Sequence, residues 1–284
     1  MRIALQMGTL ATEGFSFERS IEVAESLGFQ AVEVWMDRNM LWPLSTSRKD
    51  VKEANELLEA KEIDCVSTCP IPFEAEAWET FSFEFNLADP SEEKRRKAVE
   101  FFKKAIDLTV QLGAKLMLTL PGKVEQPNFM LSEASYRRHW NQSVKSIKEC
   151  ASYAEELGVA LGVENAVVGS FCDTPYELKR IVKDVDSQNV KVYLDIANAN
   201  TFYPPMDYVK ELKGLLAECI HVTDNDGNYA YHLPIGMGTI DFHEVIMGLE
   251  KAGWNGYLLP EVFYKDDPIE GLRISKEALE KLII

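Results

Sequence analysis

The stretch "VALGVENAVVGSFCDTPYELKRIVKDVDSQNVKVYLDIAN", residues 159–198, contains a complete strand–helix–strand unit. Its two ends, 159–165 and 190–198, are short apolar runs, which is the pattern of parallel strands buried on both faces. Residues 174–185 have helical spacing between them and open with the capping-box sequence "TPYE" at Thr174. The stretch therefore predicts one βαβ unit of a parallel sheet.

The same alternation runs through the rest of the chain. We expect further strands at 2–8, 30–36, 63–69, 114–122, 218–226 and 256–262, and further helices at 16–29, 47–62, 91–112, 132–157, 205–217, 241–253 and 269–284. Eight such units in 284 residues match an α/β fold of the (β/α)8 TIM-barrel type, whose usual length is about 250 residues. With no linker-like stretch in between, residues 1–284 are predicted to be a single domain.

The alternative fold is a doubly wound open sheet, which uses the same strand and helix pattern. In its dinucleotide-binding form, the first strand would be followed by the glycine pattern G-x-G-x-x-G. The corresponding stretch here, "QMGTLATEG" at residues 6–14, does not fit that pattern. The barrel is therefore the favoured interpretation.

The charge and composition of the chain argue against nucleic acid and membrane as partners. The net charge of −16 repels polyanions, so nucleic acid is not expected as a partner. No apolar stretch approaches the length of a membrane span, and the N-terminal segment has the pattern of a first strand instead of a signal peptide. The five cysteines are odd in number and scattered, which indicates reduced thiols and a cytoplasmic location.

Four consecutive predicted strands end on side chains that can bind metal. They are Glu164, Asp195, His221 and Glu261. Taken singly, a glutamate could bond a loop backbone, an aspartate could cap the next helix, and a histidine could be a satisfied core residue. Taken together, they place three carboxylates and an imidazole at one rim of the barrel, where carboxylates repel one another unless a cation is present. We therefore predict one divalent ion, with Mn, Mg, Co and Zn all compatible with these ligands.

The whole eight-unit chain resembles the xylose-isomerase-like TIM-barrel superfamily of sugar isomerases and epimerases, which also includes inosose dehydratases and the endonuclease IV family. The specific part of the resemblance lies in the second half of the chain. The resemblance rests on "GVENA", "YLDIANAN", "HVTDNDG", "HLPIGMGTIDF" and "LLPEV". It implies that Glu164, Asp195, His221 and Glu261 are the ligands of one divalent ion, as in the ketohexose epimerases. It also implies a sugar or polyol substrate, and a homo-oligomer as one possible assembly.

Some positions differ from the family pattern. Asn198 replaces a histidine that family members often carry three residues after the aspartate, and Ala230 replaces an aspartate of the nuclease branch two residues before His232. Ser170 and Gly227 stand near places where the ketohexose epimerases use a glutamate and an arginine to touch substrate. These differences argue against the multi-zinc cluster of the nucleases. They also put in question whether the substrate is a ketohexose.

Other residues are candidates for substrate contact. His232 resembles a family position that lines the pocket, and Asn198 is placed to bond a substrate hydroxyl. Four aromatic residues are candidates for an apolar wall against a sugar, although packing is the usual role of such residues: Trp35, Trp42, Phe73 and Trp78. Lys123, in "LPGK", is a candidate for binding an acidic substituent.

The loop between His221 and His232 carries further polar residues. Asp224 and Asp226 have two interpretations, either turn chemistry or a hydrogen bond that fixes His221. Gly236 and Gly238 are expected to let the following loop turn tightly.

The predicted reaction is proton abstraction next to a carbonyl. The metal would bind the substrate carbonyl and its neighbouring hydroxyl and hold the resulting enediolate, while Glu164 and Glu261 take and return the proton. Return to the opposite face gives epimerisation, and return to the adjacent carbon gives isomerisation. A dehydratase or related lyase of a cyclic polyol or keto-acid is the alternative enzyme. A nuclease and a non-catalytic sugar-binding barrel are the other two hypotheses.

Overall fold

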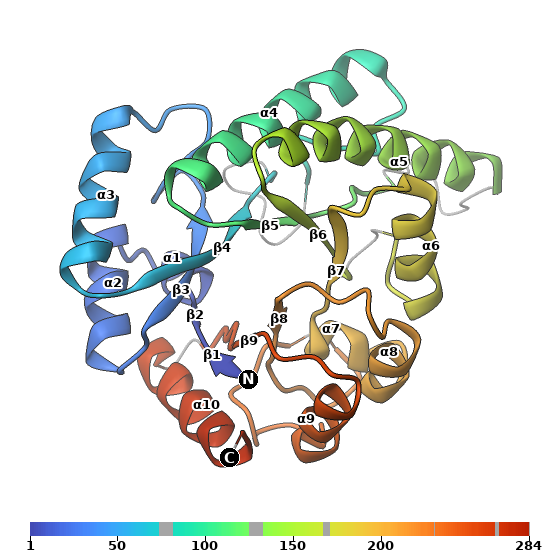
Figure 1. Cartoon of the computed structure of the whole chain (residues 1–284). Helices are drawn as coiled ribbons and strands as arrows, with labels where there is room; N and C mark the ends of the chain where they lie inside the picture. Colours follow the sequence, from blue (N-terminus) through green and yellow to red (C-terminus); the bar gives the residue numbers. More distant parts are fainter. Residues whose placement is uncertain (74–81, 125–132, 167–170, 230, 265–266, 284) are drawn as a thin grey trace.

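The computed structural model describes residues 1–73, 82–124, 133–166, 171–229, 231–264 and 267–283. Within these residues the strands form a closed parallel barrel with helices around it (Figure 1). The strand bounds are β1 Arg2–Ile3, β2 Leu5–Gln6, β3 Ala31–Met36, β4 Asp64–Pro70, β5 Leu116–Thr119, β6 Ala160–Glu164, β7 Val190–Tyr193, β8 Cys219–His221 and β9 Tyr257–Leu259. The helix bounds are α1 Gly8–Ala11, α2 Phe17–Ser26, α3 Arg48–Ala60, α4 Glu92–Gln111, α5 Glu133–Glu156, α6 Pro175–Val185, α7 Ile196–Asn200, α8 Pro205–Glu211, α9 Phe242–Lys251 and α10 Pro268–Leu282.

The first barrel strand is divided into β1 and β2, and this division closes the ring. β1 pairs with β9, and β2 pairs with β3, so the two segments face opposite neighbours. On the far side, β7 and β8 are joined by single parallel bridges, one of which pairs Asp195 with His221. The His221 N–H donates to Leu194 O at 2.9 Å. Eight parallel strand positions in sequence order therefore form a TIM barrel, as the sequence predicts.

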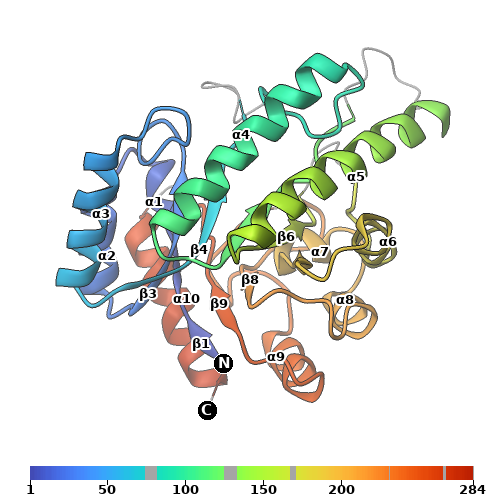
Figure 2. The ribbon, with the colours of Figure 1, turned by 45° about the horizontal axis from the view of Figure 1, so that its top comes forward.

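The helices lie on the outside, and local sequence signals set where they begin. Thr174 forms the predicted capping box at the start of α6, and Asp241 accepts from the Glu244 N–H at the start of α9. Such caps stabilise a helix by about 1 kcal/mol each. α4 and α5 lie side by side on the same outer side of the barrel, at the top of Figure 1 and turned forward in Figure 2. In the parts of the chain that the structure describes, no helix is long and apolar enough to cross a membrane.

Two predicted strands end earlier than expected, because the chain turns into a short helix. The run expected to continue to residue 198 stops at Tyr193, and α7 begins at Ile196. Asp195 causes the turn, since its side chain accepts from the Asn198 N–H at 2.6 Å as the N-cap of α7. The expected strand at 2–8 likewise gives way to α1 at Gly8.

A bulge between β3 and β4 changes which side chains face each other. Val32 pairs with Cys65, but the next residue, Glu33, pairs with Ser67, so the register shifts by one residue on β4. Bulges commonly re-aim side chains next to functional sites. Here the shift places the Ser67 hydroxyl 2.7 Å from the Glu33 carboxylate in the buried interior.

Gly162 is predicted to be intolerant of a side chain. It lies on β6 two residues before Glu164, and a Cβ there would stand 2.8 Å from Cδ2 of the buried Tyr193 ring. We expect Gly162→Ala to lower the free energy of unfolding by about 1–3 kcal/mol, as overpacked cores do. Urea denaturation measures this change, and a free energy equal to that of the wild type would show that the Tyr193 ring moves aside without cost.

Candidate metal centre

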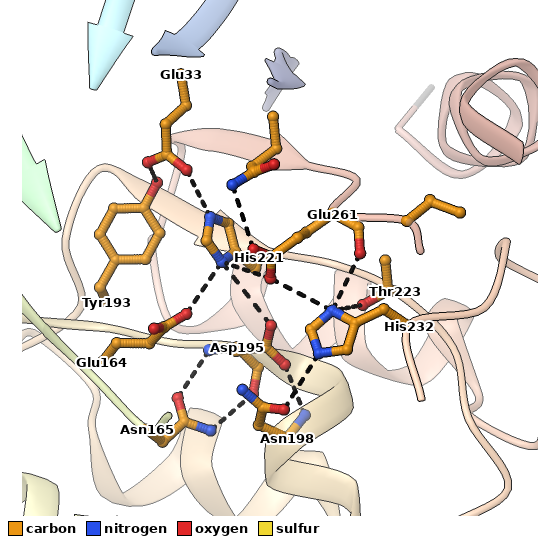
Figure 3. Close-up of polar contacts among 12 residues, drawn as sticks. Glu33, Glu164, Asn165, Tyr193, Asp195, Asn198, His221, Thr223, His232 and Glu261 are labelled. Carbon is orange, nitrogen blue, oxygen red and sulfur yellow. Dashed lines mark hydrogen bonds and ion pairs between the residues drawn. The ribbon is translucent and has the colours of Figure 1, made fainter. Parts of the chain in front are cut away.

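The four predicted ligands meet at the carboxyl ends of the last four barrel strands (Figure 3). Glu164 is the last residue of β6 and His221 the last residue of β8. Asp195 lies two residues beyond β7 and Glu261 two residues beyond β9. One ligand atom from each residue can be chosen so that all lie within 4.8 Å of one another, and all four residues are buried.

The His221 imidazole is the centre of the cluster. Its Nδ1 lies 3.1 Å from Glu164 Oε1, 3.2 Å from Glu261 Oε2 and 3.8 Å from Asp195 Oδ2. A bare nitrogen lone pair aimed at three carboxylates would be repelled. The arrangement therefore needs either a proton on Nδ1 or a cation between the nitrogen and the oxygens.

Asp195 supplies a second observation that fits a cation. Its Oδ1 is occupied as the cap of α7, whereas its Oδ2 is buried and accepts no hydrogen bond among the residues that the structure describes. A buried acceptor without a partner costs about 1–3 kcal/mol, and more when it is charged. The Asp195 backbone is held firmly, because Asn165 exchanges two hydrogen bonds of 2.8 Å with its N–H and C=O. The free oxygen is therefore fixed in place, facing the His221 ring.

Glu33 orients the His221 ring from the other side. His221 Nε2 lies 2.7 Å from Glu33 Oε1, and the second Glu33 oxygen accepts from Ser67 and from the Tyr193 hydroxyl. This carboxylate–histidine pair fixes the tautomer, because Nε2–H donates to Glu33 and leaves Nδ1 for the cluster. The sequence analysis missed this role. The signal was an acid in the middle of the buried run "AVEVWM".

Asn198 and His232 both lie beside the four candidate ligands. His232 Nε2 lies 3.3 Å from Asn198 Oδ1, and its Nδ1 lies 3.0 Å from the Glu261 C=O and 3.3 Å from Glu261 Oε2. Glu261 is held from a third direction by Gln6, whose Nε2 donates to its Oε1 at 3.2 Å. His232 therefore supports the carboxylate of Glu261 and stands at the edge of the ligand cluster.

The other predicted substrate contacts lie outside the contacts drawn in Figure 3. Trp35 is buried at the end of β3, and its ring packs so closely on Gly8 that a Cβ there would be 2.6 Å away. Lys123 is half-buried, with its backbone N–H and C=O bonded to the Asn86 side chain. Trp78, Ser170 and Ala230 lie outside the described residues.

Burial and neighbouring charges shift the pKa values of the candidate ligands. Burial raises the pKa of Glu164 to about 7 and also raises the pKa of Asp195. Burial opposes the charge on Glu261 as well, but the neighbouring histidines prevail and hold the pKa of that carboxyl below its usual range.

The two histidines respond in the opposite sense. Burial disfavours their charged forms, yet the carboxylates of Glu261 and Glu33 raise the pKa of His221 well above its usual range. The pKa of His232 rises to about 9, mainly through Asp195 and Glu261. Without a cation, the cluster therefore holds protons that a divalent ion would displace.

Comparison with known families identifies the family of this chain. Residues 21–282 match the family model described as a xylose isomerase-like TIM barrel. The chain belongs to the xylose isomerase-like TIM barrel family. An uncharacterized protein of Methanocaldococcus jannaschii is 31% identical over 238 residues, which are 82% of this chain and 76% of that protein. The fructoselysine 3-epimerase of Shigella flexneri is 23% identical over 290 residues, which are 97% of this chain and 95% of the epimerase.

Solved structures with the same architecture match the whole chain. A D-tagatose 3-epimerase-like protein superposes with a TM-score of 0.82 at 26% identity, over 99% of this chain and 98% of its own. The IOLI protein, whose crystal structure has a bound zinc atom, superposes with a TM-score of 0.80 at 19% identity, over 100% and 98% of the two chains. At that identity the second match shows the fold alone.

We predict that divalent ions stabilise the protein more at higher pH. Folding raises the pKa of Glu164 from 4.5 to about 7, so the stability that this proton contributes is lost as pH rises through that window. The raised pKa of His221 acts in the same sense at higher pH. Because Mn²⁺ competes with these protons, the increase in Tm on adding Mn²⁺ should be larger at about pH 8 than at about pH 6. An equal increase at both pH values would show that protons and metal do not share the site.

Glu33→Gln tests the support of His221. The substitution keeps the size of the side chain but removes the charge that faces Nε2, so we expect Mn²⁺ affinity to fall by about 10–100-fold. Isothermal titration measures the affinity. The control is Ser67→Ala, which removes one donor to Glu33 and leaves its carboxylate against His221, so it should have a smaller effect. Equal affinities in all three proteins would contradict the role of Glu33.

Proposed function

We propose that this protein is a divalent-metal-dependent sugar isomerase or epimerase that moves a proton at the carbon next to a substrate carbonyl. The observation that carries the proposal is the placement of two glutamates around one imidazole. Glu164 and Glu261 come from β6 and β9, approach His221 Nδ1 within 3.1 and 3.2 Å, and lie on opposite sides of it in Figure 3. A substrate held at this cluster would have a carboxylate on each side.

The residues that would hold the ion are Glu164, Asp195, His221 and Glu261. They fit it, because they combine an imidazole nitrogen aimed at carboxylates with a buried aspartate oxygen that accepts no hydrogen bond from the described part of the chain. When bound, the ion supplies a Lewis acid that polarises the carbonyl of the substrate. Three oxygens and one nitrogen are compatible with Mn, Mg, Co or Zn.

The chain's own residues would move the proton. One glutamate takes the proton from the carbon next to the carbonyl, and the electrons of the broken C–H bond pass into an enediolate. The other glutamate, which carries a proton at that moment, delivers it to the opposite face of the same carbon. The product is then the epimer, whereas delivery to the adjacent carbon gives the isomer. His232 and Gln6 contribute by holding the Glu261 carboxylate in position.

The relatives support a sugar as the substrate. Fructoselysine 3-epimerase and D-psicose 3-epimerase from Ruminiclostridium cellulolyticum are among the proteins similar to this chain. The net charge of −16 favours an uncharged sugar or polyol over nucleic acid as partner. Assembly as a homo-oligomer and a cytoplasmic location belong to the same proposal.

Isotope exchange with the two glutamate variants tests this proposal. The wild type with Mn²⁺ is incubated in D2O with a panel of ketoses, inososes and keto-acids, and NMR locates the incorporated deuterium. We expect deuterium at the carbon next to the carbonyl of a ketose. Glu164→Gln should lose exchange from one epimer and Glu261→Gln from the other, because each glutamate serves one face.

The controls separate proton transfer from metal binding. Bound Mn²⁺ is measured in every sample, and excess Mn²⁺ is added so that both variants are compared at equal occupancy. Full exchange by Glu164→Gln in both directions would remove that residue from its role. Loss of water from a polyol or keto-acid, with no exchange into any ketose, would identify a lyase instead.

A further inference from the structure

Asp224 is a buried carboxylate whose bonds are made to the backbone of the loop that follows it. It lies three residues after His221 and is 1% exposed. Its side chain accepts four backbone N–H groups, from Asn225 at 2.9 Å, Gly236 at 3.0 Å, Gly238 at 2.9 Å and Ile240 at 3.1 Å. The alternative considered from sequence, a hydrogen bond to His221, is not what the structure shows.

The four donors span residues 225–240, so this one carboxylate ties both ends of the loop together. Each Asp224 oxygen accepts two of them, and the backbone of Asp224 adds a reciprocal pair of 2.9 Å bonds to Leu233. A carboxylate that accepts several backbone N–H groups is a strong anchor, because charged acceptors make short and strong hydrogen bonds. The space around it is full, since a Cβ on Gly238 would stand 2.3 Å from Asp224 Oδ1 and from Asn225 O.

The residue that this loop delivers to the site is His232. It directly precedes Leu233, which is bridged to Asp224, and its ring lies between Asn198 Oδ1 and the Glu261 carboxylate. The position of that ring therefore depends on the path of the loop. Thr223, which directly precedes Asp224, adds a contact of 3.3 Å between its hydroxyl and His232 Nδ1.

We propose that Asp224 is a positioning residue, which sets the place of the His232 imidazole against Glu261 by holding the backbone of the 232–240 loop. It does so without touching any of the four metal ligands through its side chain. Its effect on turnover rests on the proposed function, whereas its effect on the His232 ring does not.

Asp224→Asn and Gly238→Ala break the same anchor in two ways. The asparagine replaces a carboxylate oxygen with an NH2 group that faces backbone donors, and the alanine pushes its methyl group into Asp224. Asp226→Asn is the matched control, because Asp226 is exposed and bonds the Asn228 N–H in a local turn. All three proteins keep the metal ligands.

Three measurements test this proposal: the ring NMR signals of His232, the affinity for Mn²⁺ and the rate of isotope exchange. The chain has four histidines, so ring ¹⁵N–¹H spectra in the presence of Mg²⁺ can resolve His232. We expect its ring signals to move in both anchor variants and to stay in place in Asp226→Asn. Mn²⁺ affinity should fall in both anchor variants, because His232 supports the carboxylate of Glu261. At saturating Mn²⁺ and ketose, the rate of exchange should still fall on the order of 10-fold or more through misplacement of His232.

Wild-type amide spectra provide a test that needs no variant. The Gly236 and Gly238 amide protons should be protected from exchange with solvent, as hydrogen-bonded groups are. The inference is overturned if these amides are unprotected, or if the His232 signals of the folded variants equal those of the wild type. If no ketose shows exchange in any protein, the proposed function fails, while the His232 and amide measurements still decide the role of Asp224.

Discussion

Repulsion among the carboxylates that the barrel brings together around His221 is the constraint that governs this site. Glu164, Asp195 and Glu261 face its Nδ1, while Glu33 faces its Nε2, and all are buried. Such a group is stable only with positive charge in its centre, whether protons or a metal ion. Burial raises the pKa of Glu164, and the carboxylates of Glu261 and Glu33 raise that of His221, so protons on these two groups meet part of this requirement.

The fold meets this requirement with rigid supports. Each candidate ligand sits at or just beyond the end of a barrel strand, and three of the four are held by side chains outside the set. Asn165 fixes the Asp195 backbone, Gln6 and His232 hold Glu261, and Glu33 orients His221. Sites with supporting contacts of this kind keep their geometry through a catalytic cycle. The arrangement therefore suits chemistry in which a proton is moved between fixed carboxylates.

Much of this could be predicted from sequence, because the signals were local or repeated. Apolar runs alternating with capped helices indicate the barrel, and the type of residue at four successive strand ends indicates the ligands. Contacts between residues far apart in the sequence could not be predicted from such local patterns. Tyr193 and Ser67 bond Glu33 only because the barrel closes and because a bulge shifts β4, and neither fact is written in a local pattern. The helix at Ile196 was missed for another reason. Asp195 follows an apolar run, as a strand-end candidate ligand would, but its side chain caps the helix that begins there.

The side chains that hold the candidate ligands come from both halves of the chain, which limits how this barrel can be divided. A polypeptide that began at residue 159 would contain all four candidate ligands, from Glu164 to Glu261, and would lack the Glu33 carboxylate that bonds His221. The bond between Glu33 and His221 thus joins the two half-barrels through the interior. If the two halves were expressed separately, they would have to restore this contact before the candidate site could bind an ion. Association of the halves and ion binding would therefore be coupled.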